Sequence, residues 1–100
     1  MRNIIWAPRA LEDVEAHIDY INERSLTGAD LVADRLGGAV LSLRDMPTGR
    51  PGKVPGTYER YVRKASLIIA FELVDTDRLI ILRVIHAARD WPDGQWPKED

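Results

Sequence analysis

Two short apolar runs in the second half of the chain constrain the fold more than any other feature. Residues 67–71 read Leu-Ile-Ile-Ala-Phe and residues 79–82 read Leu-Ile-Ile-Leu, with an acidic turn at residues 75–77 between them. Runs of this length, rich in isoleucine and bounded by a turn, are typical of central strands that are covered on parts of both faces. We therefore predict strands at residues 67–74 and 78–86 that pair as a hairpin in the middle of a sheet.

Two further strands complete the predicted sheet. Residues 57–64 form an extended segment before the hairpin, and residues 2–6 form a short strand that Pro8 ends. Residues 47–56, with three prolines and three glycines in ten positions, are predicted to be a loop.

The segment between the first strand and this loop has helical periodicity. In residues 9–23 the apolar positions recur at spacings of three and four, and a second stripe follows a predicted N-cap at Thr27. The short connection predicts an antiparallel helical hairpin. Gly37 and Gly38 interrupt the second helix, which we attribute to close backbone packing or, alternatively, to a kink. The predicted buried stripes are Leu11, Val14, Ile18 and Ile21 in the first helix, and Val32, Leu36, Ala39, Val40 and Leu43 in the second.

These elements give an α+β fold in the order β-α-α-β-β-β, an antiparallel sheet packed against the helical hairpin, as one domain over residues 1–100. The chain has no cysteine, which excludes disulfides, thiol catalysis and cysteine-bound metal. The first residues do not resemble a signal peptide and no stretch is long enough to span a membrane. We therefore expect a cytoplasmic protein with no membrane partner.

Charge is distributed unevenly along the chain. The net charge is −2, but residues 50–89 contain eight basic and four acidic residues, a net of +4. This asymmetry predicts one face that is able to meet an acidic partner.

At this point the order of elements and several strings resemble the ParE/RelE superfamily of bacterial toxins. The opening Trp6-Ala7-Pro8-Arg9-Ala10-Leu11-Glu12-Asp13-Val14 is similar to the family's first strand and helix start, and Ile18-Asp19-Tyr20-Ile21 to the end of that helix. The loop strings Gly49-Arg50-Pro51-Gly52 and Val54-Pro55-Gly56-Thr57 also resemble the family, as do Ile81-Leu82-Arg83-Val84-Ile85-His86 and Arg89-Asp90-Trp91-Pro92 in the last strand and its exit. The resemblance covers about nine-tenths of the chain and implies the RelE/ParE-like fold.

The resemblance implies a toxin of a type II toxin–antitoxin system that a cognate antitoxin neutralises, and it leaves two activities open. ParE-like members poison DNA gyrase by binding, whereas RelE-like members are endoribonucleases that cut messenger RNA on the ribosome. A third alternative is a member that only binds its antitoxin. Whether the chain is an enzyme therefore depends on its site.

RNA cleavage by attack of the 2′-hydroxyl needs a base, an acid and cations that stabilise the phosphorane. If the chain is RelE-like, these groups come from Lys53, Arg60, Arg63, Arg83 and His86, with Glu59 as a possible base. Against this hypothesis, the chain is mildly acidic, and Trp91 stands where an RNA-cutting relative would often place a titratable side chain.

We therefore favour the ParE-like branch, with no catalytic residues. String Gly56-Thr57-Tyr58-Glu59 is similar to the Gly-Thr-Arg-Glu of ParE-like chains, with Tyr58 in place of arginine. The residues expected to contact the target, DNA gyrase, are Arg83, His86, Arg89 and Trp91.

Several of these residues also have structural interpretations. Arg83 is as well placed to pair with Glu59 or Glu72 across the sheet as to bind phosphate. Strand parity puts Arg60 and Arg63 on opposite faces, so that they are not expected to share a site. Asp13 and His17, four residues apart on the first helix, are expected to be an ion pair on an exposed face rather than metal ligands.

The antitoxin is expected to fold across the helical hairpin and the sheet. Exposed leucines beside the buried stripe are suited to an amphipathic helix, and the basic segment to an acidic antitoxin tail. The predicted antitoxin-binding residues are Leu26, Leu31, Leu41, Arg50 and Arg63. No cofactor and no metal are expected.

Overall fold

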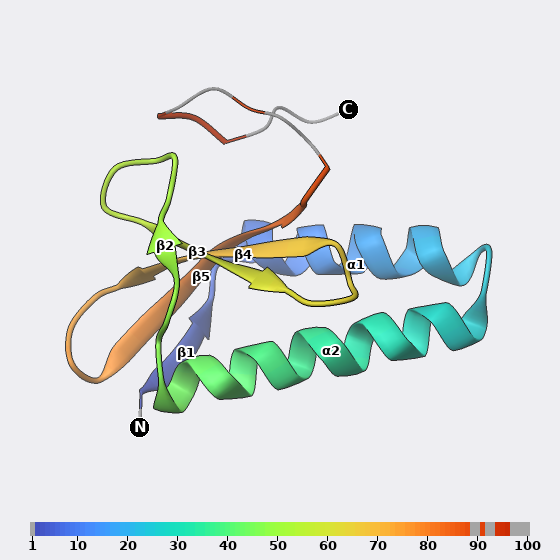
Figure 1. Ribbon diagram of the computed structural model, residues 1–100, viewed down its shortest axis with the longest axis horizontal. Helices are drawn as coiled ribbons and strands as arrows, with labels where there is room; N and C mark the ends of the chain where they lie inside the picture. Colours follow the sequence, from blue (N-terminus) through green and yellow to red (C-terminus); the bar gives the residue numbers. More distant parts are fainter. Residues whose placement is uncertain (1, 89–90, 92–93, 97–100) are drawn as a thin grey trace.

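The computed structural model describes residues 2–88, 91 and 94–96 of the chain. Two helices and five strands follow one another in the order β1-α1-α2-β2-β3-β4-β5 (Figure 1). The α+β class and the predicted order of elements are confirmed. A short strand that was not predicted, β2, lies within the predicted loop. The bounds are β1 Asn3–Trp6, α1 Pro8–Asn22, α2 Leu26–Asp45, β2 Arg50–Pro51, β3 Tyr58–Val62, β4 Leu67–Leu73 and β5 Arg78–His86.

The strands form one sheet in the order β1-β5-β4-β3-β2. The two most apolar strands, β4 and β5, lie near its middle, as predicted, and pair antiparallel from Leu67 opposite His86 to Leu73 opposite Leu79. One pair departs from the antiparallel prediction, because β1 runs parallel to β5. The strands β2 to β5 alternate in direction through three antiparallel pairs, and β1 joins the edge of β5 in the same direction as β5, so the sheet is mixed.

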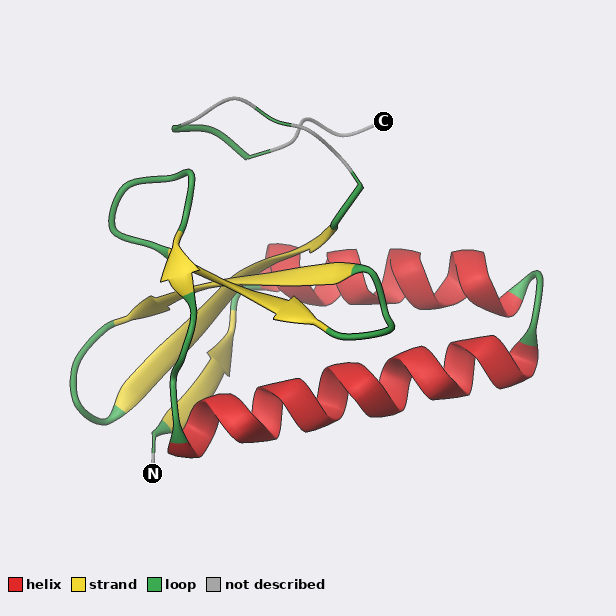
Figure 2. Ribbon diagram, in the orientation of Figure 1, coloured by secondary structure: helices red, strands yellow, loops and turns green. Residues whose placement is uncertain are grey.

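Both helices cover one face of the sheet and run antiparallel to each other (Figure 2). Pro8 is at the start of α1, where its missing N–H costs nothing. The N-cap of α2 is Ser25, whose hydroxyl accepts the N–H of Gly28 at 3.0 Å, so the predicted cap at Thr27 is wrong. Ser25 is extended and Thr27 is already helical, and only an extended residue can act as the cap.

The main core lies between the sheet and the helices. Apart from Leu11, the residues of the predicted stripes are buried in this core or packed against it. Leu11 is 53% exposed, because it lies on the outer side of α1 rather than on its sheet side. A smaller cluster forms on the opposite face of the sheet, where Trp91 packs with Ile68 and Ile85. The buried residues of the main core are Ala10, Val32, Leu36, Leu43, Val62, Leu67, Ile69, Phe71, Leu79, Ile81 and Val84.

The prediction that Gly37 and Gly38 allow a close backbone approach is wrong. A Cβ atom on either glycine would meet no atom within 4 Å, and both residues are exposed. Packing within the described part of the chain therefore gives no reason for two glycines in the middle of α2.

Candidate functional site

On the β1 side, none of the described strands lies beside the second half of β5. β1 ends at Trp6, opposite Ile81, so the outer edge of β5 after this point needs other hydrogen-bond partners. α1 supplies them: Asp13 Oδ2 accepts the N–H of Val84 at 3.0 Å, and His17 Nε2 lies 3.0 Å from the carbonyl oxygen of Val84. Because a carbonyl only accepts, His17 carries its proton on Nε2. The i, i+4 spacing of Asp13 and His17 thus serves to replace a neighbouring strand.

Arg83 is held by the same carboxylate. Its Nε donates to Asp13 Oδ2 at 2.7 Å and its Nη2 to Asp13 Oδ1 at 3.3 Å, and both side chains are about nine-tenths buried. Arg9 adds a longer contact to Asp13. The predicted partners Glu59 and Glu72 are therefore wrong, as is the exposed Asp13–His17 pair. The actual pairs join residues seventy positions apart, which local periodicity does not reveal.

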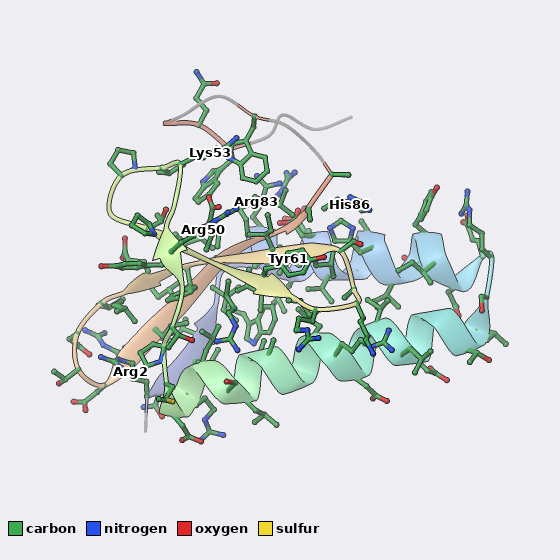
Figure 3. The ribbon with its side chains drawn as sticks, viewed as in Figure 1. Arg2, Arg50, Lys53, Tyr61, Arg83 and His86 are labelled. Atoms are coloured by element: carbon green, nitrogen blue, oxygen red, sulfur yellow. The ribbon has the colours of Figure 1, made fainter. Side chains whose placement is uncertain are left out.

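Lys53, on the loop between β2 and β3, is engaged with the C-terminal segment. Its Nζ donates to the carbonyl oxygen of Trp91 at 2.7 Å and lies 4.5 Å from the centroid of the Trp91 ring. The N–H of Gly94 donates to the carbonyl oxygen of Lys53. These contacts join the loop to the segment that covers the face of the sheet opposite the helices (Figures 1 and 3).

Glu59 is almost completely buried on β3, and both of its oxygens are used. Oε1 accepts from Arg50 at 3.3 Å, and Oε2 accepts the backbone N–H of Lys53 at 3.0 Å. A carboxylate with these partners holds the β2–β3 loop in place. Glu59 is thus an anchor of the loop.

His86 lies at the end of β5 and is exposed (Figure 3). Its Nδ1 accepts the N–H of Ala88 at 3.1 Å, so the proton of the neutral ring is on Nε2. Its ring centroid is 6.4 Å from that of His17. Of the residues predicted to contact the target, Arg83 and Trp91 are buried, His86 is exposed, and Arg89 lies outside the described residues.

An open apolar groove of about 730 Å³ runs between α1 and α2 on their outer side. Leu11 and Leu41, both exposed, lie on its opposite walls, with Trp6 at the end of β1 also in the lining. Gly37 leaves one wall bare. We call this surface the leucine groove; its lining is Trp6, Leu11, Val14, Glu15, Ile18, Asp19, Ala33, Leu36, Gly37, Val40 and Leu41.

The three leucines predicted to bind the antitoxin are all exposed, but only Leu41 lines the leucine groove. Leu26 and Leu31 lie outside it. Sequence reasoning missed Leu11, which it placed in the core, and Gly37. The pair of glycines in mid-helix was the available signal, since it costs helix stability without a turn to form.

A second groove, of about 690 Å³, lies between α2 and β3 on the other side of α2. Arg60 and Arg63 both line it, contrary to the prediction from strand parity, because β3 ends at Val62 and Arg63 no longer follows the alternation of the strand. We call this surface the arginine groove; its lining is Arg35, Gly38, Ala39, Ser42, Thr48, Gly49, Arg50, Glu59, Arg60, Tyr61, Val62 and Arg63.

Within the described ranges, no group of three or more histidine, aspartate or glutamate side chains is arranged to hold a metal ion. In the same ranges, neither helix is long and apolar enough to cross a membrane.

Comparison with known proteins places these features in a family. Residues 4–91 match the model of the ParE toxin of the type II toxin–antitoxin system parDE. The candidate toxin Y4kP of Sinorhizobium fredii (strain NBRC 101917 / NGR234) is 33% identical over 92 residues, covering 91% of this chain and 94% of that protein.

Two solved structures have the same fold. A chain of the chromosomal ParDE system from P. aeruginosa superposes with a TM-score of 0.77 at 21% identity, covering 86% of this chain and 96% of the other. A chain of the intact E. coli RelBE toxin–antitoxin complex gives a TM-score of 0.63 at 15% identity, covering 89% of this chain and 100% of the other.

Proposed function

The chain belongs to the ParE toxin family of type II toxin–antitoxin systems, and from this premise we propose that it inhibits DNA gyrase by binding and is neutralised by a cognate antitoxin in the cytoplasm. The observation that carries the proposal is that three of the groups a nuclease would need, Lys53, Glu59 and Arg83, are already engaged within the protein. The alternative, cleavage of messenger RNA on the ribosome, needs cations and a titratable pair that are free to meet the substrate.

Most of the side chains that the nuclease hypothesis requires are poorly placed for it. Arg83 is buried against Asp13, and the ammonium group of Lys53 is bonded to the C-terminal segment. Both oxygens of Glu59 hold the β2–β3 loop. Among the described residues of this hypothesis, His86 and Arg63 are exposed, but His86 does not line the groove that holds Arg60 and Arg63. A titratable group outside the cationic groove does not make a phosphorane site. Trp91 packs against Ile68 and Ile85 on the sheet face opposite the helices. Coverage of this face supports inhibition through a binding surface rather than catalysis.

The leucine groove supports the antitoxin half of the proposal. It is open, mostly apolar, and bounded by two helices whose exposed leucines face the same space. Such a groove fits the apolar face of an amphipathic helix, with side chains at positions i, i+3 or i+4, and i+7 as anchors. Burial of these anchors supplies roughly 25 cal/mol per Å² of apolar surface removed from water.

A gyrase assay tests the proposed target. The purified chain is expected to inhibit supercoiling of a relaxed plasmid by gyrase, and addition of the cognate antitoxin is expected to restore it. A parallel translation reaction on ribosomes measures cleavage of the messenger RNA. Transcript cleavage with unimpaired supercoiling would reject the proposed target and support the RNA-cutting activity.

Matched leucine substitutions test the proposed antitoxin site. Leu41→Glu places a charge in the leucine groove, whereas Leu26→Glu places the same charge on an even more exposed leucine outside it. Leu41→Glu is expected to weaken antitoxin binding at least tenfold in a calorimetric titration, and Leu26→Glu less than twofold. Equal effects of the two variants would exclude the leucine groove as the site.

A further inference from the structure

We propose that the arginine groove binds a short acidic peptide segment of the antitoxin, which reaches it from the leucine groove by crossing α2 at Gly37 and Gly38. This inference rests on the proposed neutralisation by an antitoxin and adds a second contact of different chemistry. It gives a role to the unexplained glycines and to three arginines, Arg35, Arg60 and Arg63, that have no carboxylate partner among the described residues.

Most of the charge of the arginine groove has no carboxylate partner among the described residues. Within these residues, Arg35 and Arg60 donate to neutral oxygens. Arg63 has no hydrogen-bond or ion-pair partner within the described residues. Of the arginines that line the groove, Arg50 is the one paired with a carboxylate of the described part of the chain, that of Glu59. Elsewhere, Arg9, Arg24, Arg78 and Arg83 each pair with a carboxylate within 4 Å.

The neutral contacts also orient two of the guanidinium groups. Arg35 Nη1 is fixed at 3.0 Å from the carbonyl oxygen of Lys64, and Arg60 Nη1 at 2.7 Å from Thr48 Oγ1. Each group keeps further N–H donors for a ligand, since a guanidinium has five. Guanidinium groups held in this way match the planar fork of a carboxylate, and little side-chain entropy remains to be lost on binding.

The glycine pair connects the two grooves. Gly37 lines the leucine groove and Gly38 the arginine groove, although the two are adjacent in the chain. Both are exposed, and the space where a Cβ atom would stand is open. At this level α2 therefore presents bare backbone between the two grooves, and residues 37 and 38 place no side chain in the way of an extended peptide that crosses the helix.

The occupant is a peptide rather than a nucleic acid. The chain carries a net charge of −2, which opposes the approach of a long polyphosphate more than that of a few carboxylates. Grooves for single-stranded nucleic acid combine cations with several stacking aromatic rings. Here Tyr61 is the one aromatic residue in the lining.

A titration with a defined acidic probe tests the ligand class. Binding of fluorescein-labelled decaglutamate to the full chain is followed by anisotropy and compared with binding of a labelled oligothymidine. The variant Arg35→Gln/Arg63→Gln removes two charges from the groove, and glutamine keeps a donor for the carbonyl of Lys64. The matched control, Arg2→Gln/Arg24→Gln, removes the same charge outside the groove. Thermal melting of each variant checks that it is folded.

We expect the groove variant to weaken decaglutamate binding at least tenfold and the control less than twofold. Gly38→Leu, which fills the groove without changing its charge, is also expected to weaken binding. Equal losses in the groove variant and the control would overturn the proposal. So would oligothymidine binding that is as tight as decaglutamate binding and depends on the same arginines.

The cognate antitoxin separates this inference from the proposed function. If the wild-type chain and the antitoxin do not co-purify, the proposed neutralisation fails. If they co-purify but the groove variant and Gly38→Leu bind the antitoxin as tightly as the wild type, neutralisation stands and the acidic contact is rejected. Loss of affinity in both variants, with an affinity that falls as salt is raised, supports the acidic contact.

Discussion

Two sets of arginines in this protein differ in burial and in their hydrogen-bond partners. Arg83 is buried on β5 and is held by Asp13 through two hydrogen bonds, while the same carboxylate also accepts the N–H of Val84. Arg35, Arg60 and Arg63 line an open groove with no carboxylate partner among the described residues. The first arrangement ties α1 to the edge of the sheet, and the second leaves charge available to a ligand.

Structural and functional charges in a chain of this size differ in what their removal costs the fold. Removing one member of a buried pair leaves the other as an uncompensated charge in a medium of low polarity, which is costly. An exposed arginine held by neutral oxygens, or by none, contributes little to folding. Stability measurements on the two sets should therefore differ sharply.

Asp13→Ala is expected to give the largest effect. It leaves the Arg83 guanidinium and the N–H of Val84 buried without an acceptor. The free energy of unfolding should therefore fall by about 3–5 kcal/mol, a large part of the total stability of a small domain. Urea denaturation measures this loss. Arg63→Ala, as the counterpart from the groove, should change the free energy by less than about 0.5 kcal/mol.

Asp13→Asn separates the charge of Asp13 from its hydrogen bond to Val84. Asparagine can still accept the N–H of Val84 but cannot neutralise Arg83, so its cost should lie between those of Asp13→Ala and Arg63→Ala. If Asp13→Ala cost no more than Arg63→Ala, the buried pair would not stabilise the fold and the distinction between the two sets would collapse.

The fold was largely predictable because its signals are local. The apolar runs of β4 and β5, and the spacing of Val14 and Ile18 on α1, follow directly from the period of each element. The parallel β1–β5 pair was not predicted, because it joins segments separated by the whole helical hairpin.

The site was less predictable, because its groups come from distant segments or depend on exact element ends. The Asp13–Arg83 pair spans seventy residues of sequence. The common position of Arg60 and Arg63 depends on the end of β3 at Val62, two residues earlier than predicted. Exposed leucines could be identified from the helical pattern, but which of them line a groove depends on how α1 packs against α2.

Gly38→Ala is expected to have a smaller effect, of the opposite sign. Alanine is favoured over glycine in a helix interior by about 1 kcal/mol, and a Cβ atom at this position meets nothing within 4 Å. The midpoint of urea unfolding should therefore rise. Gly28→Ala is the control, because its Cβ would lie 3.3 Å from atoms of the Ser25 side chain and should give little or no gain.

A gain at Gly38 would mean that the bare stretch of α2 is retained at a cost in stability, as expected of a surface that a partner covers. If Gly38→Ala lowered stability instead, the glycine would be needed by the fold itself. The glycine pair would then no longer support the proposal that a peptide crosses α2 between the two grooves.

The smallest expected effect concerns the exposed ion pair between Arg78 and Asp75. Arg78 donates to Asp75 Oδ2 through both Nε and Nη2 in the turn between β4 and β5. The side-chain hydrogen bond from Arg78, aided by the backbone N–H of Asp77, lowers the pKa of Asp75 below its usual value of 3.8. A carboxyl group whose pKa is lower in the folded state stabilises the fold above its unfolded pKa, and this stabilisation is lost as pH falls through the folded pKa.

Thermal melts of the wild type and Asp75→Asn between pH 6 and pH 2 measure this contribution. The wild type should melt slightly higher than the variant near neutral pH, and the difference should close as the pH falls below about 4. Asp77→Asn, which changes the same charge in the same turn, is the control and should show a weaker dependence. A difference that stays constant down to pH 2 would show that Asp75 acts through the geometry of the turn and not through its charge. The charge of the Arg78–Asp75 pair, like that of the arginines in the groove, would then contribute little to the stability of the fold.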